Sequence, residues 1–179
     1  MVLQAPTKNS GFTLIELIVG IVIMAIALTF MTNVFFSNPG RSVEPMMQIR
    51  AIEFGQALMD EILSKKFDDT TPMGGVPACV ACTASGNFGS EAESRSSYDD
   101  VDDYHDSCGA PVPLTDGLGV GVSNFMGYTM EVCVSYDGNY DGVADNNINA
   151  KLITIKLYLP SGAGIGAAPV TLSSYRGNF

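Results

Sequence analysis

The chain has 179 residues, which is enough for one folded domain with a substantial core. Its 9 Lys and Arg residues against 19 Asp and Glu residues give a formal net charge of -10. A surface that binds nucleic acid needs clustered cations to meet the phosphates, and no such cluster stands out, so we exclude nucleic acid as a partner. The hydrophobic fraction of 46% is typical of a globular head joined to one membrane segment.

A long uncharged run follows a short polar start. Residues 17–36 are twenty consecutive uncharged residues, about the length needed to cross the hydrocarbon core of a bilayer. Lys8 precedes the run and favours a cytoplasmic position for that end. An ordinary signal peptide would be cut after its apolar run, next to small residues, and the run would be lost. We expect residues 12–36 to be retained as a transmembrane helix.

One carboxylate, Glu16, lies at the start of this apolar segment. Burial of a charge there costs roughly a few kcal/mol unless a partner pairs it, which marks the residue as a functional candidate. The sequence Gly-Phe-Thr-Leu-Ile-Glu at residues 11–16, followed by Leu-Ile-Val, resembles the signature of type IV prepilins and type II secretion pseudopilins. In that family a membrane-embedded peptidase cuts after the glycine and methylates the new amino terminus. The resemblance implies a leader peptide at residues 1–11, cleavage by prepilin peptidase between Gly11 and Phe12, and N-methylation of Phe12.

The resemblance also implies how this segment works. Glu16 would neutralise the freed amine of Phe12 on a neighbouring subunit, because neither buried charge is tolerable alone. The helix at 12–36 would form the filament core, and the partners would be other pilin subunits, the prepilin peptidase and an inner-membrane assembly platform. The chain would cross the bacterial inner membrane once, with residues 37–179 as a periplasmic head, and would reach the pilus on the cell surface after assembly. The alternative is a plain transmembrane anchor whose carboxylate snorkels to the membrane surface.

The head begins with a second helical pattern. Residues 46–67 carry apolar side chains at spacings of three, four or seven, which predicts an amphipathic helix that packs on a sheet. Its predicted apolar stripe consists of Ile49, Ile52, Leu58, Met59, Ile62 and Leu63. A helix lying on the membrane surface is the alternative, but it would need more cations. Asn38-Pro39-Gly40 predicts a kink before the helix, and Gly55 weakens it while permitting close packing.

Strand patterns dominate the carboxyl-terminal part. Apolar and polar residues alternate over 128–136 and again over 151–159, as in half-buried strands. A third strand is expected around 169–175, which gives a sheet within 128–175. The order of elements predicts an α+β fold of the type IV pilin-like kind. In that fold a long amino-terminal helix, half transmembrane and half amphipathic, packs on an antiparallel sheet with a long irregular loop region.

The region 68–127 is rich in Gly, Ser, Asp and Pro and shows no sustained periodicity, so we expect a long irregular insertion. The cysteines all lie downstream of the apolar segment, and hence on one side of the membrane: Cys79, Cys82, Cys108 and Cys133. An even number of cysteines in an oxidising compartment favours disulfides. Their connectivity stays open at this point.

The cysteines also permit two other interpretations. Cys79 and Cys82, together with His105 and Cys108, have the C-x2-C and H-x2-C spacing of a tetrahedral zinc site. The Cys-Val-Ala-Cys sequence also has the spacing of a thioredoxin-type redox pair, although its neighbours do not suggest the βαβ unit in which that chemistry occurs. Either would make the chain a membrane-tethered zinc or thiol enzyme. We favour disulfides, because thiols outside the cytoplasm tend to oxidise before they bind zinc.

A candidate calcium loop lies between the first two strand patterns. The sequence Asp-Gly-Asn-Tyr-Asp-Gly-Val-Ala-Asp at 137–145 places oxygen ligands at alternating positions and glycine at the sixth. A structural Ca2+ would be held by Asp137, Asn139, Asp141, the carbonyl of Val143, and Asp145. The twelfth position is Ile148 and not glutamate, so the loop is not an EF-hand. The alternative is a solvated hairpin turn, since Asp, Asn and Gly favour turns by themselves.

A second acidic stretch, residues 98–106, has five aspartates in nine residues. Such runs are usually solvated, and we expect a solvated loop here, with binding of a cation or a basic partner as the alternative. No Ser/His/Asp or Cys/His catalytic arrangement is recognisable, and the sequence requires no cofactor. The resemblance implies a structural and not an enzymatic function, and the irregular, cysteine-linked insertion and the acidic loops favour a minor pilin that takes part in pilus assembly and surface adhesion. The alternative within the family is a type II secretion pseudopilin.

Overall fold

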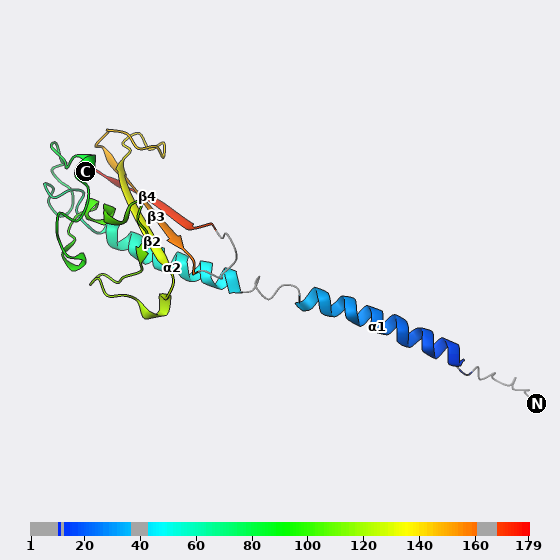
Figure 1. Ribbon diagram of the computed structural model, residues 1–179. Coiled ribbons are helices and arrows are strands. Elements are labelled where there is room, and N and C mark those ends of the chain that lie inside the picture. The colour runs from blue at the N-terminus through cyan, green and yellow to red at the C-terminus, as the bar shows by residue number, and fades with distance from the viewer. Residues whose placement is uncertain (1–10, 12, 37–42, 161–167) are drawn as a thin grey trace, which may run out of the picture. The chain divides into compact units, whose positions relative to one another are not determined.

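The computed structural model describes residues 11, 13–36, 43–160 and 168–179, and the chain divides into two units at residue 42 (Figure 1). The first unit contains helix α1, Leu14–Phe36. Its stretch Leu14–Phe35 is long and apolar enough to cross a membrane. This agrees with the expected span at 12–36. The kink predicted at Asn38-Pro39-Gly40 lies outside the described residues.

The second unit is the head, in which one helix packs on an antiparallel sheet. Helix α2 spans Val43–Leu63. The sheet has the order β1-β2-β3-β4, with all neighbouring strands antiparallel. Its strands are β1, Val112–Pro113; β2, Thr129–Tyr136; β3, Ala150–Tyr158; and β4, Val170–Gly177. The predicted α+β, pilin-like fold is confirmed, and Figure 1 shows α2 lying along the three long strands.

The main core forms where α2 faces the sheet. Alternate residues of β2 and β3 point toward the helix, as their sequence periods predict, and they pack with one face of α2 and part of the insertion. This core comprises Ala51, Leu58, Met59, Ile62, Val101, Tyr104, Leu114, Tyr128, Met130, Val132, Val134, Ile153, Ile155 and Leu157. Gly55 is buried within α2, and a Cβ atom added there would lie 2.5 Å from Leu172 Cδ1 and 2.7 Å from Leu157 Cδ1. Glycine therefore lets α2 approach β3 and β4 closely.

Helix α2 differs in two ways from the predicted amphipathic helix at 46–67. It begins three residues earlier and ends at Leu63, because the chain then turns to form a bridge between Lys66 and Asp100. For two members of the predicted stripe, the prediction of burial is also wrong. Ile49 is 57% exposed and Ile52 is 37% exposed, since the face of α2 that packs on the sheet carries Ala51, Leu58 and Ile62 and lies beside these two residues. Ala51 is buried in their place.

The insertion between α2 and β2 is irregular, as expected, and is built from short 3-10 helices. These are η2, Ser85–Asn87; η3, Arg95–Ser97; η4, Asp102–Ser107; and η5, Ser123–Phe125. Helix η4 lies against β2 beyond the short pairing with β1. There Ser107 Oγ accepts the Val132 N–H at 2.9 Å, and His105 Nδ1 accepts the Val134 N–H at 3.0 Å. Two side chains therefore occupy the edge of β2 that a neighbouring strand would otherwise pair.

Candidate functional site

The amino-terminal motif forms the first turn of α1. The Glu16 N–H donates to Thr13 Oγ1 at 3.4 Å and to Thr13 O at 3.1 Å, so Thr13 caps the helix. Glu16 then lies in the first turn, where the helix dipole favours a carboxylate. Gly11 is exposed and has nothing within 4 Å of where a Cβ would be, which leaves its backbone accessible. Phe12 lies outside the described residues.

The rest of α1 presents only apolar or internally satisfied groups to its surroundings. The Thr29 hydroxyl donates to Ala25 O at 2.8 Å, and the Thr32 hydroxyl donates to Leu28 O at 2.9 Å. Such bonds satisfy polar groups where water is absent. All side chains described between Leu14 and Phe35 are exposed within this unit. The helix therefore needs lipid, or the helices of other subunits, to cover it.

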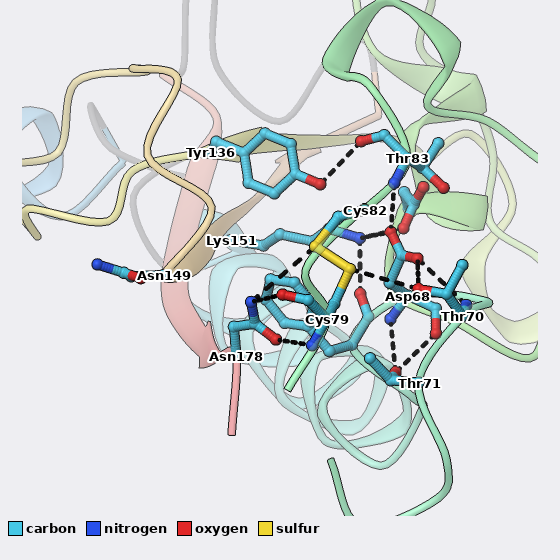
Figure 2. The surroundings of a disulfide bond; sticks show 12 residues. Asp68, Thr70, Thr71, Cys79, Cys82, Thr83, Tyr136, Asn149, Lys151 and Asn178 are labelled. Atoms are coloured by element: carbon cyan, nitrogen blue, oxygen red, sulfur yellow. Dashed lines mark hydrogen bonds and ion pairs between the residues drawn. A yellow bond between two sulfur atoms is a disulfide. The ribbon is translucent and has the colours of Figure 1, made fainter. Parts of the chain in front are cut away.

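The first disulfide joins Cys79 to Cys82 in a loop beside the carboxyl-terminal residues (Figure 2). The Asn178 side chain holds this loop through the backbone N–H and C=O groups of a single residue, Cys79. Its Oδ1 accepts the Cys79 N–H at 2.8 Å, while its Nδ2 donates to Cys79 O at 2.9 Å. The Thr70 hydroxyl donates to Cys79 Sγ at 3.3 Å. The Asn178 hydrogen bonds therefore fasten this loop of the insertion to the residue that follows β4, and Cys79 is buried.

The second disulfide joins Cys108, just after η4, to Cys133 in β2. Glu131 supports this junction, because its Oε1 accepts the Gly109 N–H at 3.2 Å and its Oε2 accepts the Tyr158 hydroxyl at 2.8 Å. The Tyr158 hydroxyl and the other donors outweigh burial and hold the pKa of Glu131 below its ordinary value. The insertion is thus linked covalently to the sheet.

These pairings contradict the zinc interpretation. Cys108 is bonded to Cys133 and not grouped with Cys79 and Cys82, and His105 accepts a backbone N–H from β2. The four residues of the C-x2-C and H-x2-C pattern are thus not assembled into one site. The redox interpretation also lacks its structural context, since Cys79 and Cys82 lie in a loop and not at the start of a helix.

The acidic stretch at 98–106 is not the solvated loop that the sequence predicted. Asp100, Asp102 and Asp103 are all buried. The reason is Lys151 of β3, whose side chain has no exposed area and whose Nζ donates to Asp102 Oδ1 and, at 2.6 Å, to Phe67 O. Asp68 Oδ2 lies 3.6 Å from the same nitrogen (Figure 2). A buried cation thus draws the aspartates inward, because burial of a charge is tolerated only when the charge is paired.

The buried aspartates have opposite electrostatic environments. Burial would raise the pKa of Asp68, but hydrogen bonds from Thr70 and the Thr83 N–H outweigh it and hold that pKa below its ordinary value. For Asp100, burial and the neighbouring charge of Asp102 act together and raise the pKa to about 8. Asp68 is therefore a carboxylate at neutral pH, whereas Asp100 is mostly protonated at neutral pH.

The candidate calcium loop uses its oxygens for hydrogen bonds within the head. Asp137 is buried, and its Oδ2 accepts the Gly142 N–H at 2.8 Å and the Tyr175 hydroxyl at 2.5 Å. Asp141 Oδ1 accepts the Val143 N–H at 2.8 Å, and Asp145 Oδ1 accepts the Gly138 N–H at 3.3 Å. Asn139 Nδ2 donates to Asp141. The loop therefore has the turn geometry of the alternative interpretation, and calcium binding stays a prediction.

Sequence reasoning missed Lys151, Asp68 and Asn178 as organising residues. A signal existed for Lys151, because it precedes Ile153, Ile155 and Leu157 in the same alternation and must share their buried face. No comparable signal marked Asp68 or Asn178, because the cation beside Asp68, Lys151, and the partner of Asn178, Cys79, lie far away in the sequence.

Comparison with known proteins agrees with the amino-terminal motif. The prokaryotic N-terminal methylation motif, which is a prepilin-type motif, matches residues 6–32. Comparison with curated proteins and with solved structures gives no match. The motif is characteristic of type IV pilins and pseudopilins, which are generally structural proteins and not enzymes, and the fold of the head is pilin-like. Processing by a prepilin peptidase and assembly with other pilins follow from the motif, and the apolar helix fits a pilin anchored in the inner membrane.

Proposed function

We propose that the chain is a minor subunit of a type IV pilus that takes part in pilus assembly and surface adhesion. The observation that carries the proposal is the prepilin-type motif at 6–32, continuous with an apolar helix whose described side chains are all uncovered. The minor role is supported by the head, where a long disulfide-linked insertion covers part of the sheet. Such a specialised head suits a subunit used in few copies better than one that repeats along a fibre.

The proposed mechanism begins with processing. Prepilin peptidase cuts after Gly11, where the absence of a side chain lets the backbone enter a tight subsite, and methylates Phe12. The apolar helix then holds the subunit in the inner membrane until a cytoplasmic ATPase drives its extraction into a filament. Glu16 pairs with the Phe12 amine of a neighbouring subunit, and burial of the helices against one another replaces their lipid contacts.

A finer assignment rests on the acidic stretch. The sequence Asp-Asp-Val-Asp-Asp-Tyr at 99–104 and the character of the whole chain resemble the D-type minor pilin of the mannose-sensitive haemagglutinin pilus system. The burial of three of these aspartates shows that the stretch has a structural task in the head. We propose membership of that pilus type on this resemblance.

The first test is intact mass spectrometry of the membrane-extracted protein after expression with its prepilin peptidase. The expected product begins at methylated Phe12, and the Gly11→Val variant is expected to retain residues 1–11. A wild-type chain that keeps its leader beside an active peptidase would contradict the proposal. Alkylation before and after reduction adds a count of free thiols, expected to be zero and four, respectively, for two disulfides.

A second test separates a pilus subunit from a type II secretion pseudopilin. Intact cells are labelled with an antibody against the head, and the sheared surface fraction is probed for the processed chain. A pilus subunit is expected in that fraction, because the fibre extends beyond the outer membrane. Retention of all processed chain in the periplasmic and membrane fractions would favour the pseudopilin.

A further inference from the structure

The buried charges around Lys151 do not balance. Asp68, Asp100 and Asp102 each have a carboxylate oxygen within 4.8 Å of those of the other two, and all three residues are buried. The ammonium of Lys151 contacts Asp102 and Asp68. Three carboxylates beside one ammonium would leave net negative charge in a region of low dielectric constant, which is costly. A proton on one of the acids reduces this excess from two negative charges to one, which lowers the cost of keeping the cluster buried.

The geometry identifies Asp100 as the acid that holds this proton. Asp68 receives hydrogen bonds from Thr70 and the Thr83 N–H, which favour its carboxylate form, and Asp102 forms an ion pair with the ammonium. Within the described residues, Asp68 and Asp102 form ion pairs with Lys151 but Asp100 does not, so Asp100 is the acid of the cluster that can carry a proton without breaking an ion pair. Its Oδ1 accepts the N–H groups of Asp102 and Asp103, a role that the protonated form also fills.

The cluster joins three separate parts of the head. Asp68 lies at the start of the insertion, Asp100 lies just before η4 and Asp102 at its start, and Lys151 belongs to β3. Aromatic rings surround the ammonium, with centroids 4.7 Å away for Phe67 and 5.0 Å away for Phe88. These rings limit access of water, so any charge added here is poorly screened. A change in the charge of the cluster therefore acts on the contact between insertion and sheet.

We propose that a single proton on Asp100 locks the insertion onto the sheet, and that the lock loosens as the proton is lost. The titratable groups that face Asp100 come from every element packed around it. They are Lys66 and Asp68 from the segment after α2, Asp102 and Asp103 from η4, Tyr136 from β2, and Lys151 from β3. Burial also raises the pKa of Asp103, as it does that of Asp100. The N–H groups of Asp99 and Asp100, which Asp103 accepts, act in the opposite direction.

The direction of the effect follows from proton linkage. The pKa of Asp100 in the folded head is about 8, above its ordinary value of 3.8. Between these two values the locked state holds a proton that the open state releases, so the lock weakens as pH rises and is weakest above pH 8. The lowered pKa of Asp68 has the opposite effect, because it makes the locked state more stable as pH rises. This effect acts only at acidic pH, below the pH range of the test.

The test is hydrogen exchange with mass spectrometry on the full chain in detergent micelles, over a pH series from 5 to 9. After correction for intrinsic exchange rates, the opening constant of peptides covering 99–107 is expected to rise by up to about tenfold per pH unit up to pH 8, and then to level off. Peptides from the centre of β3, residues 153–157, serve as the internal reference. A wild-type profile that is flat for 99–107 overturns the proposal without any variant.

Two variants then assign the proton. Asp100→Asn keeps a neutral side chain of the same shape, so protection of 99–107 is expected to lose its pH dependence and to stay at the level of acidic wild type. Asp60→Asn removes an exposed acid of α2 and is expected to keep the wild-type slope. If Asp100→Asn folds and retains that slope, another group carries the proton and the proposal is wrong.

Discussion

The two units of this chain use apolar residues in opposite ways. In α1 every side chain described from Leu14 to Phe35 is exposed, so these side chains bury little apolar surface within their own unit. In the head, α2 and the sheet bury their apolar faces against each other, and two disulfides and a buried ion cluster add further links. The comparison teaches that changes in α1 should affect insertion and assembly, whereas changes in the head should affect folding.

Glu16→Leu should produce the largest effect, and it should be confined to assembly. The substitution leaves the helix apolar enough for the membrane but leaves the Phe12 amine of a neighbour unpaired, a loss of several kcal/mol on the scale of buried pairs. Processed protein is expected at wild-type levels in the membrane, with at least about a tenfold loss from the sheared filament fraction, since about 1.4 kcal/mol already changes an equilibrium tenfold. Unchanged incorporation would show that Glu16 has no pairing role.

Lys151→Met should be the most damaging single change in the head. It leaves Asp68 and Asp102 buried without their cation, and breaking a buried pair typically costs about 3 to 5 kcal/mol. Urea unfolding of the full chain in detergent, followed by circular dichroism, measures this loss. Lys156→Met in the same strand is the matched control, because that side chain is half exposed beside Glu131 and should contribute only about 0 to 1 kcal/mol.

Loss of either disulfide should have the next largest effect on the free energy of unfolding, and the two losses should differ in size. Replacing Cys108 and Cys133 together by alanine opens a link across 25 residues, for which chain entropy predicts a loss of about 3 to 4 kcal/mol. The corresponding change at Cys79 and Cys82 opens a link across 3 residues and should cost about 2 kcal/mol. The same unfolding experiment compares the pairs, and a larger effect at Cys79 and Cys82 would show that the Asn178 contacts depend on that bridge.

Gly55→Val should give the smallest effect and provides the most direct comparison of the units. The new side chain would meet Leu157 and Leu172, and overpacking of this kind costs about 1 to 3 kcal/mol. Gly20→Val in α1 has nothing within 4 Å of its Cβ and should leave unfolding of the head unchanged. Equal effects of the two substitutions would contradict the view that only the head is stabilised by its own packing.

Periodic and motif signals in the sequence predicted the elements whose interactions are local or repeated. The uncharged run predicted α1, and the alternation at 128–136 and 151–159 predicted β2 and β3 to within a residue or two at each end. The insertion was harder, because its structure depends on partners that no local pattern reveals. Lys151 changes the environment of aspartates 49 residues away, and a run that is usually solvated becomes part of the interior.

The exposed Ile49 and Ile52 illustrate a related limit. Their helical spacing is correct for an apolar stripe, but spacing does not tell which of two neighbouring stripes faces the sheet, and the buried stripe contains Ala51. The motif residues Gly11, Phe12 and Glu16 were the most readily identified, because a cleavage and assembly signal has to be local for a peptidase to recognise it. Their roles await the mass and assembly measurements above.

The side chains that cover the β2 edge also affect how the sheets of two heads could pair with each other. An unpaired strand edge is a template on which another chain can add a strand, and proteins protect such edges against aggregation. Here the Val132 and Val134 N–H groups are already occupied by Ser107 and His105 of the same chain. Because η4 provides this cover, an event that releases the insertion would also uncover a site for strand addition between heads. Packing of the insertion therefore keeps this part of the β2 edge unavailable to a strand from another head.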